Sequence, residues 1–461
     1  MDAVTFLKFA EKQKNYFLSG ATRPASFRIE KLKTLKASIR RHERDIFDAL
    51  YADMKKPPFE AYASEIGFLY DEVNYAIRHV RSWMKPERVR TPILHFPSSS
   101  YIRQDPLGVV LIIAPWNYPV QLVLTPLIAA IAAGNCAVVK PSEFAPASSV
   151  IVETIIRECF SPEHVMTIQG EGHDVIPMMM SQFRFDHIFY TGGVVVAKRI
   201  ASEAAKDLIP VTLELGGKSP CIVDEDSDLK VAAKRIVWGK FFNAGQTCIS
   251  PDYVLVNRKV KKEFLDLLQK AMIEFYGHDP APDSDIARII DERHFTRLTE
   301  FLKNGPILHG GRSDKDKLFI QPTLIEVSGL DHPLMQEEIF GPILPVLEFG
   351  KIDEAMRTIR QHPYPLSLYL FTNKKVNEKR ITEEIHFGGG AVNNTLVHFA
   401  NSRLPFGGVE YSGTGAYHGK FGFDIFSHRK SITKSGTWLD IPIKYPPYKG
   451  KLKWIRMFLR P

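Results

Sequence analysis

The sequence predicts an α/β protein with parallel sheets, and two observations support this fold class. Strongly apolar runs of strand length, such as VVLIIAP at 109–115 and AVVKP at 137–141, are separated by helix-length stretches. Each run ends at a glycine or another turn-forming residue. A strand, a crossover helix and a second strand form the βαβ unit of a parallel sheet, and such strands are apolar throughout because both sheet faces are covered.

The first ninety residues are expected to form a covering layer of helices, because apolar residues recur at close to helical spacing between Ile29 and Tyr51. They are Leu32, Leu35, Ile39, Ile46 and Leu50. From Pro92 onward, prolines, serines and short alternating apolar positions in HFPSSSYIRQDPLG predict extended segments or a hairpin that projects from the body. We expect such an arm to mediate self-association.

Three more runs extend the first sheet, namely VMTIQG at 165–170, FDHIFYTGG at 185–193 and IPVTLELGG at 209–217. In open α/β sheets, ligands bind outside the carboxyl ends of the strands. We therefore expect the residues at or just past these strand ends to lie along one rim. They are Asn117, Lys140, Gly192 and Glu214.

A second α/β domain is expected after Gly217. It begins with PCIVDEDSD at 220–228, a helix over 227–242 and the strand DYVLV at 252–256, and further elements continue to about residue 425. The 461 residues, 44% of them apolar and 24% charged, are sufficient for more than one globular core.

The four cysteines are too few and too scattered for a disulfide framework, and none has the spacing of a metal site. This cysteine usage fits a reducing cytoplasm. Cys136, Cys159 and Cys221 fall in or at the ends of predicted strands and helices, so we expect them to be packing residues. No stretch reaches the roughly 18 apolar residues needed to cross a bilayer, and the N-terminus lacks the apolar core of a secretory signal.

The net charge of +8 does not indicate nucleic-acid binding, because the basic residues are spread along predicted helices instead of forming one module with aromatic residues. One local cluster is KGKLKWIRMFLRP at 449–461, where Trp454, Ile455, Phe458 and Leu459 alternate with Lys451, Lys453, Arg456 and Arg460. This tail is suited to weak contact with an anionic membrane surface, and a frayed or docked tail is the alternative.

Cys248 is the candidate nucleophile, because GKFFNAGQTCISPDY at 239–253 surrounds it with small residues that leave a thiol reachable. A cysteine in a chain of this kind can also be a buried apolar residue. Asn117 follows a strand in PWNYP, where its amide can donate to an oxyanion together with the Cys248 N–H group. Glu214 stands beside two glycines, and partial desolvation would give it the raised pKa of a general base.

Five segments together resemble the aldehyde dehydrogenase superfamily, from about residue 20 to residue 450. They are FNAGQTC (242–248), ELGGKSP (214–220), PWNYP (115–119), KPSE (140–143) and QEEIFGPILP (336–345). PLSLYLF at 365–371 and LPFGGVEYSGTGAYHGKFGFDIFSHRKS at 404–431 resemble the class 3 branch, which acts on fatty or aromatic aldehydes, and a bacterial member is the nearest in character.

The resemblance implies the aldehyde dehydrogenase fold, in which a Rossmann-type cofactor domain and an α/β catalytic domain carry a small β-hairpin oligomerisation arm. The implied segments are 1–81 and 107–212 for NAD(P) binding, 213–425 for catalysis, 82–106 and 426–446 for the arm of a homodimer, and 447–461 for a basic tail.

The resemblance also implies NAD⁺- or NADP⁺-dependent oxidation of a medium- or long-chain aliphatic or an aromatic aldehyde. Cys248 would pass through a thiohemiacetal and a thioester, and water activated by Glu214 would release the carboxylate. The implied cofactor-binding residues are Lys140, Glu143, Thr191, Gly192, Gly193, Glu338, Phe340 and Trp116. A carboxylate at Glu143 accepts a bond from a ribose 2′-hydroxyl and repels a 2′-phosphate, which favours NAD⁺.

Aromatic and polar residues near the motifs are expected to line or support an apolar substrate entrance. They are Tyr70, Tyr118, Asn393 and Phe399, with Trp116 completing an aromatic wall. No metal is expected, because no histidine or cysteine stands at ligand spacing from His187, His398 or His418, which we expect to be structural.

Two positions depart from the family pattern. Ala197 replaces the glycine that usually follows the cofactor turn by three residues, and its methyl group would narrow the approach of the backbone to the cofactor. Glu410 replaces a glycine, and a carboxylate near an entrance would disfavour anionic substrates unless it is only a solvated surface residue.

Other functions remain possible from the residues alone. They are a dehydrogenase for a specialised isoprenoid or carotenoid aldehyde, an acylating or phosphorylated-aldehyde enzyme, and an inactive scaffold. Glu214 argues against acyl transfer to coenzyme A, because a base that activates water serves hydrolysis.

Overall fold

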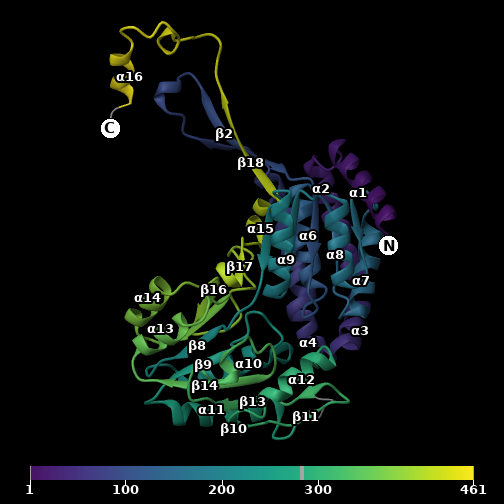
Figure 1. Cartoon of the computed structure of the whole chain (residues 1–461), viewed down its shortest axis with the longest axis vertical. Coiled ribbons are helices and arrows are strands. Elements are labelled where there is room, and N and C mark those ends of the chain that lie inside the picture. The colour runs from purple at the N-terminus through teal and green to yellow at the C-terminus, as the bar shows by residue number, and fades with distance from the viewer. Residues whose placement is uncertain (1, 281–284, 460–461) are drawn as a thin grey trace.

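The computed structural model describes residues 2–280 and 285–459. Two β-sheets with their covering helices form the body, and an extended arm projects from one end of it (Figure 1). The prediction of an α/β protein with parallel sheets is therefore confirmed.

The first sheet has six strands, and all are parallel except β17, which pairs antiparallel with β7. Across the sheet the strands are β17 (Gly413–Thr414), β7 (Val211–Glu214), β6 (His187–Thr191), β3 (Val109–Ile113), β4 (Cys136–Lys140) and β5 (Val165–Thr167). Because β3, β4, β6 and β7 are parallel neighbours, their carboxyl ends lie along one edge.

Helices cover both faces of this sheet, as the continuously apolar strands require. Alternate residues of β3 point to opposite faces, so Leu111 packs in one cluster while Val110 and Ile112 pack in another. The Leu111 face is covered by α1 (Ala3–Leu18), α8 (Gly172–Gln182) and α9 (Val194–Lys206). The opposite face is covered by α2 (Ala25–Arg41), α3 (Glu43–Met54), α5 (Gly67–Trp83), α6 (Gln121–Ala133) and α7 (Pro146–Cys159).

The helical periodicity from Ile29 to Tyr51 belongs to two helices. α2 ends and α3 begins at His42, whose backbone is non-helical in ψ. The ring of His42 bonds Asp45 at 2.7 Å and Glu158 at 3.2 Å, which fixes the junction between the two helices and α7. Beyond α3, the short helix α4 (Pro58–Ala61) continues into a π-helical turn, η1 (Tyr62–Ile66), before α5.

The second sheet has seven strands, which are parallel except at the edge strand β10. In order they are β10 (Ile307–His309), β13 (Thr323–Glu326), β14 (Ile343–Phe349), β9 (Tyr253–Asn257), β8 (Pro220–Val223), β15 (Ser367–Phe371) and β16 (Gly389–Val392). One face packs on α10 (Leu229–Phe241) and α11 (Lys261–Tyr276), and the other on α12 (Glu292–Phe301), α13 (Ile352–Arg360) and α14 (Lys375–Glu384). A separate two-stranded ladder joins β11 (Ser313–Asp314) to β12 (Phe319–Ile320).

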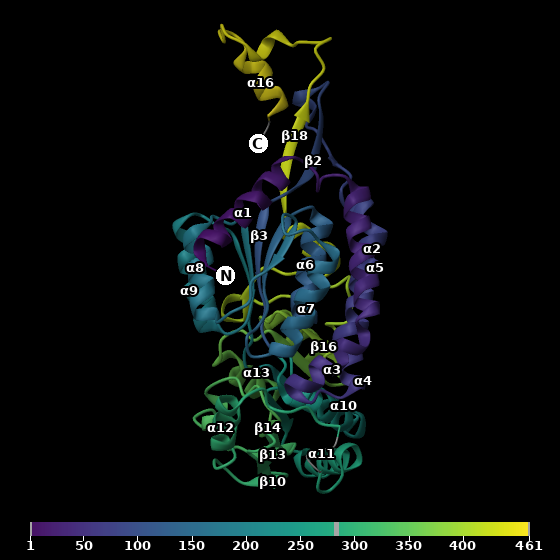
Figure 2. The same cartoon turned by 90° about the vertical axis from the view of Figure 1, so that its right-hand side faces the viewer.

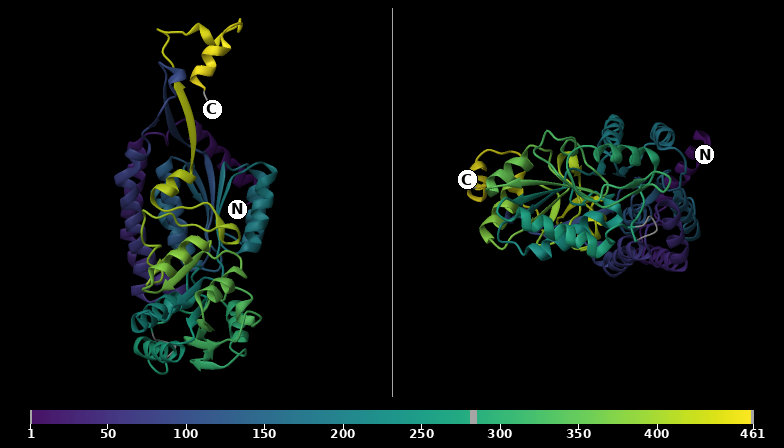
Figure 3. Two further views of the ribbon diagram at one scale, coloured as in Figure 1. Left: turned by 90° about the vertical axis from the view of Figure 1, so that its left-hand side faces the viewer. Right: turned by 90° about the horizontal axis from the view of Figure 1, so that it is seen from below.

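The arm is a three-stranded antiparallel sheet in the order β1 (Glu87–Val89), β2 (Ser99–Pro106) and β18 (Ser427–Lys434). Figures 2 and 3 show β2 and β18 side by side, reaching away from the body. The short helix α15 (Gly419–Ile425) leads from the body into β18, and α16 (Leu452–Phe458) lies at the distal end of the arm. None of the described helices is both long and apolar enough to cross a membrane.

Candidate active site

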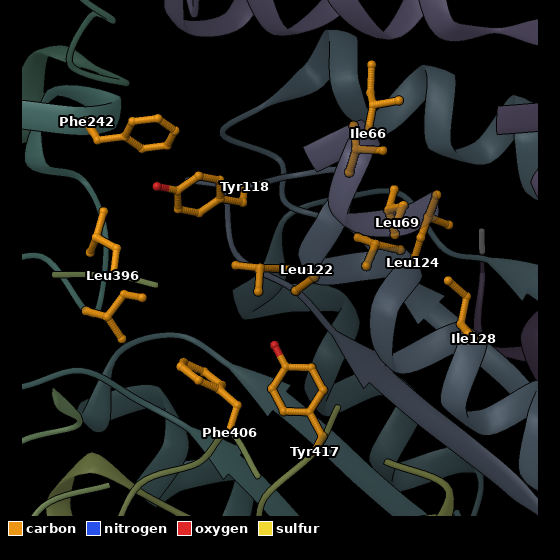
Figure 4. Close-up of a cluster of buried hydrophobic side chains, with 14 of the residues drawn as sticks. Ile66, Leu69, Tyr118, Leu122, Leu124, Ile128, Phe242, Leu396, Phe406 and Tyr417 are labelled. Atoms are coloured by element: carbon orange, nitrogen blue, oxygen red, sulfur yellow. The ribbon is translucent and has the colours of Figure 1, made fainter. Parts of the chain in front are cut away.

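A cavity of about 220 Å³ lies where the first sheet meets the loop that carries Cys248. Thr191 at the end of β6 and Glu214 at the end of β7 reach the same cavity as Cys248. Most of its wall is apolar, and Figure 4 shows several of these side chains around one open region. They include Tyr118, Leu122, Phe242, Leu396, Phe406 and Tyr417.

The loop that leads to Cys248 has an unusual backbone. The 3₁₀ turn η3 (Phe242–Gly245) follows α10 and contains three consecutive left-handed residues, with φ of 54° at Asn243, 52° at Ala244 and 72° at Gly245. Left-handed residues other than glycine cost free energy and persist where contacts enforce them. The Asn243 N–H group donates to the Glu60 carboxylate at 2.9 Å, which is one such contact.

Gln246 follows η3 in this loop, and its completely buried side chain holds the loop in place. Its amide nitrogen donates to the carbonyl oxygens of Asn243 at 3.2 Å and Arg288 at 2.9 Å, and its amide oxygen accepts from the Ile290 N–H group at 3.1 Å. Gln246 belongs to the segment GKFFNAGQTCISPDY, and no local pattern in that segment indicates a role for it. The structure shows that it anchors the loop.

The Cys248 thiol is partly exposed, and it faces the cavity. Burial raises its pKa, and the nearby carboxylates of Glu338 and Glu214 raise it further. The thiol is therefore neutral in the free site, and its proton must be removed as it attacks a substrate. The other three cysteines are buried in the core, as expected of packing residues.

Glu214 is almost fully buried, and neither oxygen of its carboxyl group has a hydrogen-bond partner within the described residues. Burial raises its pKa well above the usual range. A carboxylate that lacks partners and opens onto a cavity binds a proton strongly, so its ionised form is suited to take a proton from a thiol or from water.

Asn117 is buried beside the Cys248 loop, and it is not among the residues that line the cavity. Its amide nitrogen donates to the carbonyl oxygen of Gln246 at 3.0 Å. Because a side-chain amide carries two N–H bonds, one of them remains for a ligand. The structure therefore brings Asn117, which lies between β3 and α6, to the distant loop of Cys248.

Lys140, the last residue of β4, forms an ion pair with Glu143. Glu143 also accepts from the Gly172 N–H group at 2.7 Å. Burial opposes ionisation of Glu143, but its bonds to Lys140 and to backbone N–H groups outweigh this effect and lower its pKa. The side chain is therefore a fixed carboxylate.

The turn after β6 is open to a ligand. The Thr191 hydroxyl is buried at the cavity without a hydrogen-bond partner in the described structure. Gly193 precedes the first residue of α9, and a Cβ atom there would meet nothing within 4 Å. A Cβ at Gly192 would lie 2.3 Å from the Tyr190 hydroxyl. Ala197 is buried in the apolar cluster under α9, so its methyl group packs toward the core.

Glu338 lies against the loop that follows Glu214. A Cβ atom at Gly216 would lie 2.3 Å from a carboxylate oxygen of Glu338, so a larger residue there would displace the Glu338 carboxylate. Burial raises the pKa of Glu338 to about 8, and Asp252 adds to this effect. Phe340 has φ of 51°, and its ring meets the Trp116 ring edge-on at 5.4 Å.

These features fit a dinucleotide cofactor. The unpartnered Thr191 hydroxyl, the open helix N-terminus at Gly193 and the partly buried carboxylate of Glu338 are polar groups that can bind a ligand. Backbone N–H groups at a helix N-terminus suit a pyrophosphate, and a carboxylate suits ribose hydroxyls.

Two of the four residues expected at the substrate entrance line the cavity, namely Tyr118 and Phe399. Tyr70 does not, because its hydroxyl donates to Glu43 at 3.0 Å, away from the cavity. Asn393 does not either, because its side-chain amide makes two bonds of 3.0 Å to the backbone of Thr372. Trp116 packs on Phe340 and His294 and so forms no wall with Tyr118.

Sequence reasoning missed much of the cavity wall. The missed residues include Phe68, Trp238, Leu396, Phe406 and Tyr417. They come from widely separated segments and share no pattern beyond being apolar. Phe406 and Tyr417 lie inside the class 3 segment at 404–431, which was the one available signal.

Each of the three histidines named in the sequence, His187, His398 and His418, packs against an aromatic ring. Burial lowers the pKa of His187 and His398 to about 4 and that of His418 to about 3, so all three rings are neutral. No cluster of metal-ligating side chains occurs among the residues that the structure describes. Glu410 is exposed and is absent from the cavity wall.

Comparisons with known proteins give the family. Residues 2–432 match the aldehyde dehydrogenase family. The 4,4'-diaponeurosporen-aldehyde dehydrogenase of Staphylococcus aureus is 46% identical over 97% of both chains, and the mouse protein named "aldehyde dehydrogenase, dimeric NADP-preferring" is 41% identical over 96% of this chain and 97% of its own. A substrate-bound structure of Staphylococcus aureus AldH superposes with a TM-score of 0.95 at 45% identity, covering 99% of this chain and 100% of the other.

The expected fold, the class 3 relationship and the dependence on NAD(P)⁺ are confirmed by these relatives. The protein catalyses the oxidation of an aldehyde with a nicotinamide cofactor, and its chain belongs to the aldehyde dehydrogenase family.

Proposed function

We propose that Cys248 is the nucleophile, Glu214 the general base and Asn117 the oxyanion donor for oxidation of a long apolar or aromatic aldehyde. The observation that carries this proposal is the shared cavity, in which a partly exposed thiol and an unpartnered buried carboxylate face one apolar space. A thiol and a base at one apolar cavity are the groups that covalent aldehyde oxidation needs.

The steps follow from these groups. The Cys248 sulfur bonds to the aldehyde carbon as its proton passes by way of water to solvent, which leaves Glu214 ionised for the later step. The resulting oxyanion is stabilised by the free Asn117 amide N–H and the Cys248 backbone N–H. Bound NAD(P)⁺ supplies the hydride acceptor.

After oxidation the substrate is held as a thioester on Cys248. Glu214 removes a proton from water, the water oxygen bonds to the thioester carbon, and the C–S bond breaks to release the carboxylic acid and the thiolate. Glu338 and Phe340, with Trp116 behind the ring, would hold the nicotinamide end, and Lys140, Glu143 and the turn at 191–193 would hold the remainder.

The apolar wall supports a substrate with a long hydrocarbon or aromatic body. The Staphylococcus aureus relative is named for a carotenoid aldehyde, which agrees with such a cavity. An isoprenoid or carotenoid aldehyde is therefore the specialised substrate that we would test first.

Formation of reduced cofactor with hexanal, benzaldehyde and longer apolar aldehydes tests the proposal. We expect kcat/KM to rise with apolar length, and Cys248→Ala to abolish activity. Activity that survives in Cys248→Ala would refute the nucleophile. A rate that increases on addition of coenzyme A would instead favour an acylating enzyme.

NAD⁺ is the proposed preferred cofactor, because Glu143 is a fixed carboxylate that would repel a 2′-phosphate. We expect a higher kcat/KM with NAD⁺ than with NADP⁺ and a smaller ratio between them in Glu143→Gln. An unchanged ratio in this variant would remove Glu143 from cofactor selection.

A homodimer joined by the arm is the proposed assembly. Strands β1 and β18 are the edges of the arm sheet, and unpaired strand edges favour pairing with another chain. The mouse relative is named as dimeric. Light scattering after size exclusion should give twice the chain mass of 52.3 kDa, and a monomer would contradict the proposal.

The end of the arm is the proposed site of weak contact with an anionic membrane surface. Exposed apolar side chains at Trp438, Tyr448 and Trp454 accompany a series of basic residues. One of these basic residues, Lys451, donates to the carbonyl oxygens of Pro442 and Tyr445, so the tail folds back on itself. Residues 460 and 461 and the side chain of Phe458 lie outside the described structure.

Co-sedimentation with phosphatidylglycerol vesicles tests this contact. We expect binding that weakens with salt and in Trp454→Ser, and no binding to phosphatidylcholine vesicles. Equal binding to both vesicles would contradict it. The cytoplasm remains the proposed location, since all four cysteines are unpaired, and cell fractionation would test it.

A further inference from the structure

A buried ion pair between Lys56 and Glu65 lies beneath the segment that carries Asn117. Lys56 is 1% exposed and Glu65 is fully buried, and the ammonium nitrogen lies 2.6 Å from a Glu65 carboxylate oxygen. Withdrawing two charges from water is costly unless their remaining hydrogen-bonding capacity is used. Neither residue has a part in the proposed chemical steps.

The remaining hydrogen bonds of the pair are made to one segment, residues 117–121. The Lys56 ammonium donates to the backbone carbonyl of Asn117 at 3.2 Å and lies 4.3 Å from the centre of the Tyr118 ring. The second oxygen of Glu65 accepts the N–H groups of Val120 at 2.9 Å and Gln121 at 3.2 Å. The segment is thus held at both ends.

A π-helical turn places Glu65 in this position. In η1 the N–H group of Gly67 donates to the carbonyl of Tyr62, five residues earlier. The turn directs Glu65 into the interior, while Ala63 and Ser64 line the cavity. Single π turns are rare and occur often at functional sites.

The held segment contacts the two residues that precede Cys248. Asn117 donates to the carbonyl of Gln246 at 3.0 Å, and the Tyr118 hydroxyl lies 2.5 Å from that of Thr247. Asn243 closes the network, because its side-chain amide donates to the carbonyls of Asn117 and Gln246 at 2.9 and 3.2 Å.

We propose that Lys56 and Glu65 form a positioning pair that fixes the Asn117 amide relative to the Cys248 thiol, so that its free N–H meets the developing oxyanion. The inference rests on the proposed role of Asn117 as the oxyanion donor. Neither residue of the pair touches the substrate, and both act through Asn117.

A double-mutant cycle on kcat tests the pair, using the full-length protein with hexanal and NAD⁺. Loss of an oxyanion donor typically costs about a hundredfold, which we expect for Asn117→Ala. Lys56→Met should lower kcat by at least about tenfold, since small misplacements have effects of this size. In the Asn117→Ala background, Lys56→Met should cause no further loss.

The outcomes separate the inference from the proposed function. If the factors by which Asn117→Ala and Lys56→Met lower kcat multiply in the double variant, the pair does not act through Asn117 and the inference is wrong. If Asn117→Ala leaves kcat unchanged, the oxyanion role itself fails, and the inference fails with it.

Two controls distinguish positioning from folding. Lys56→Met/Glu65→Gln removes both charges but keeps an oxygen for the Val120 and Gln121 N–H groups. We expect it to recover thermal stability while kcat stays low, and recovery of both would overturn the inference. Arg28 is a matched buried cation at the other end of α6, where it bonds the Ala132 carbonyl at 3.0 Å, and Arg28→Met should lower stability without lowering kcat.

Alkylation of Cys248 by iodoacetamide provides a readout that needs no oxyanion donor. The other cysteines are buried, so the reaction reports Cys248. We expect the alkylation rate of Lys56→Met to match that of the unaltered protein. A fall as large as the fall in kcat would show general damage to the Cys248 loop and would overturn the inference.

Discussion

The ionisation of Cys248 is controlled by burial and by two neighbouring carboxyl groups, those of Glu338 and Glu214. Burial raises the pKa of all three, and the two carboxylates also oppose formation of the thiolate. The residue types were predictable from the motifs. Their pKa values were not, because burial depends on side chains supplied by distant segments.

Replacing Glu214 by glutamine tests its role as the base for hydrolysis. Glutamine keeps the shape of the side chain but cannot accept a proton from water. We expect a burst of reduced cofactor followed by turnover about a hundredfold slower, as for loss of a general base. Stopped-flow absorbance measures both phases, and a steady-state rate equal to that of the unaltered protein would rule out the base role.

Hydrogen bonds join the loop from η3 to Cys248 and the segment between β3 and α6 into one unit. The loop is defined by three left-handed residues, and the segment is held by Lys56 and Glu65. The motifs that form this unit, FNAGQTC (242–248) and PWNYP (115–119), are both recognisable in the sequence. The ion pair was missed, because a lysine and a glutamate near two helix ends look like ordinary surface residues.

Gly245→Ala tests the rigidity of this loop. Its φ of 72° disfavours other residues, and a Cβ atom would lie 2.3 Å from the carbonyl oxygen of Gly341. We expect kcat to fall by at least about tenfold, because the clash displaces the thiol.

Gly20→Ala is the matched control, because its φ is 79° but the nearest atom to its Cβ would be Arg23 Cδ at 3.6 Å. It should cost only about 1 kcal/mol of stability and leave kcat unchanged. Thermal unfolding and steady-state kinetics on both variants give the comparison, and equal kcat values for the two would contradict the displacement.

Acid sensitivity is a property of the whole molecule and follows from its buried neutral histidines. His187 has a pKa near 4 in the folded chain, against 6.5 for an exposed histidine, because burial disfavours its charged form. The unfolded chain therefore binds the proton first as the pH falls. The stability that this group contributes is present above pH 6.5 and is lost between pH 6.5 and 4.

His187→Gln should reduce this loss. Between pH 7.5 and 5.0 the unaltered protein should lose about 2 kcal/mol more unfolding free energy than the variant, by the difference between the two pKa values. Urea unfolding at both pH values measures it. His173 is exposed, so His173→Gln should follow the unaltered protein, and an equal pH dependence in all three would contradict the assignment.

The sequence by itself determined the fold class, the family and the identity of the candidate nucleophile, base and oxyanion donor. Apolar strand runs and contiguous motifs are local signals, so they can be read without coordinates. Only the tertiary structure decided that Tyr70 and Asn393 lie outside the cavity, that Phe406 and Tyr417 form its wall, and that Lys56 and Glu65 hold Asn117. These outcomes depend on which distant side chains meet after folding, and no local pattern encodes that contact.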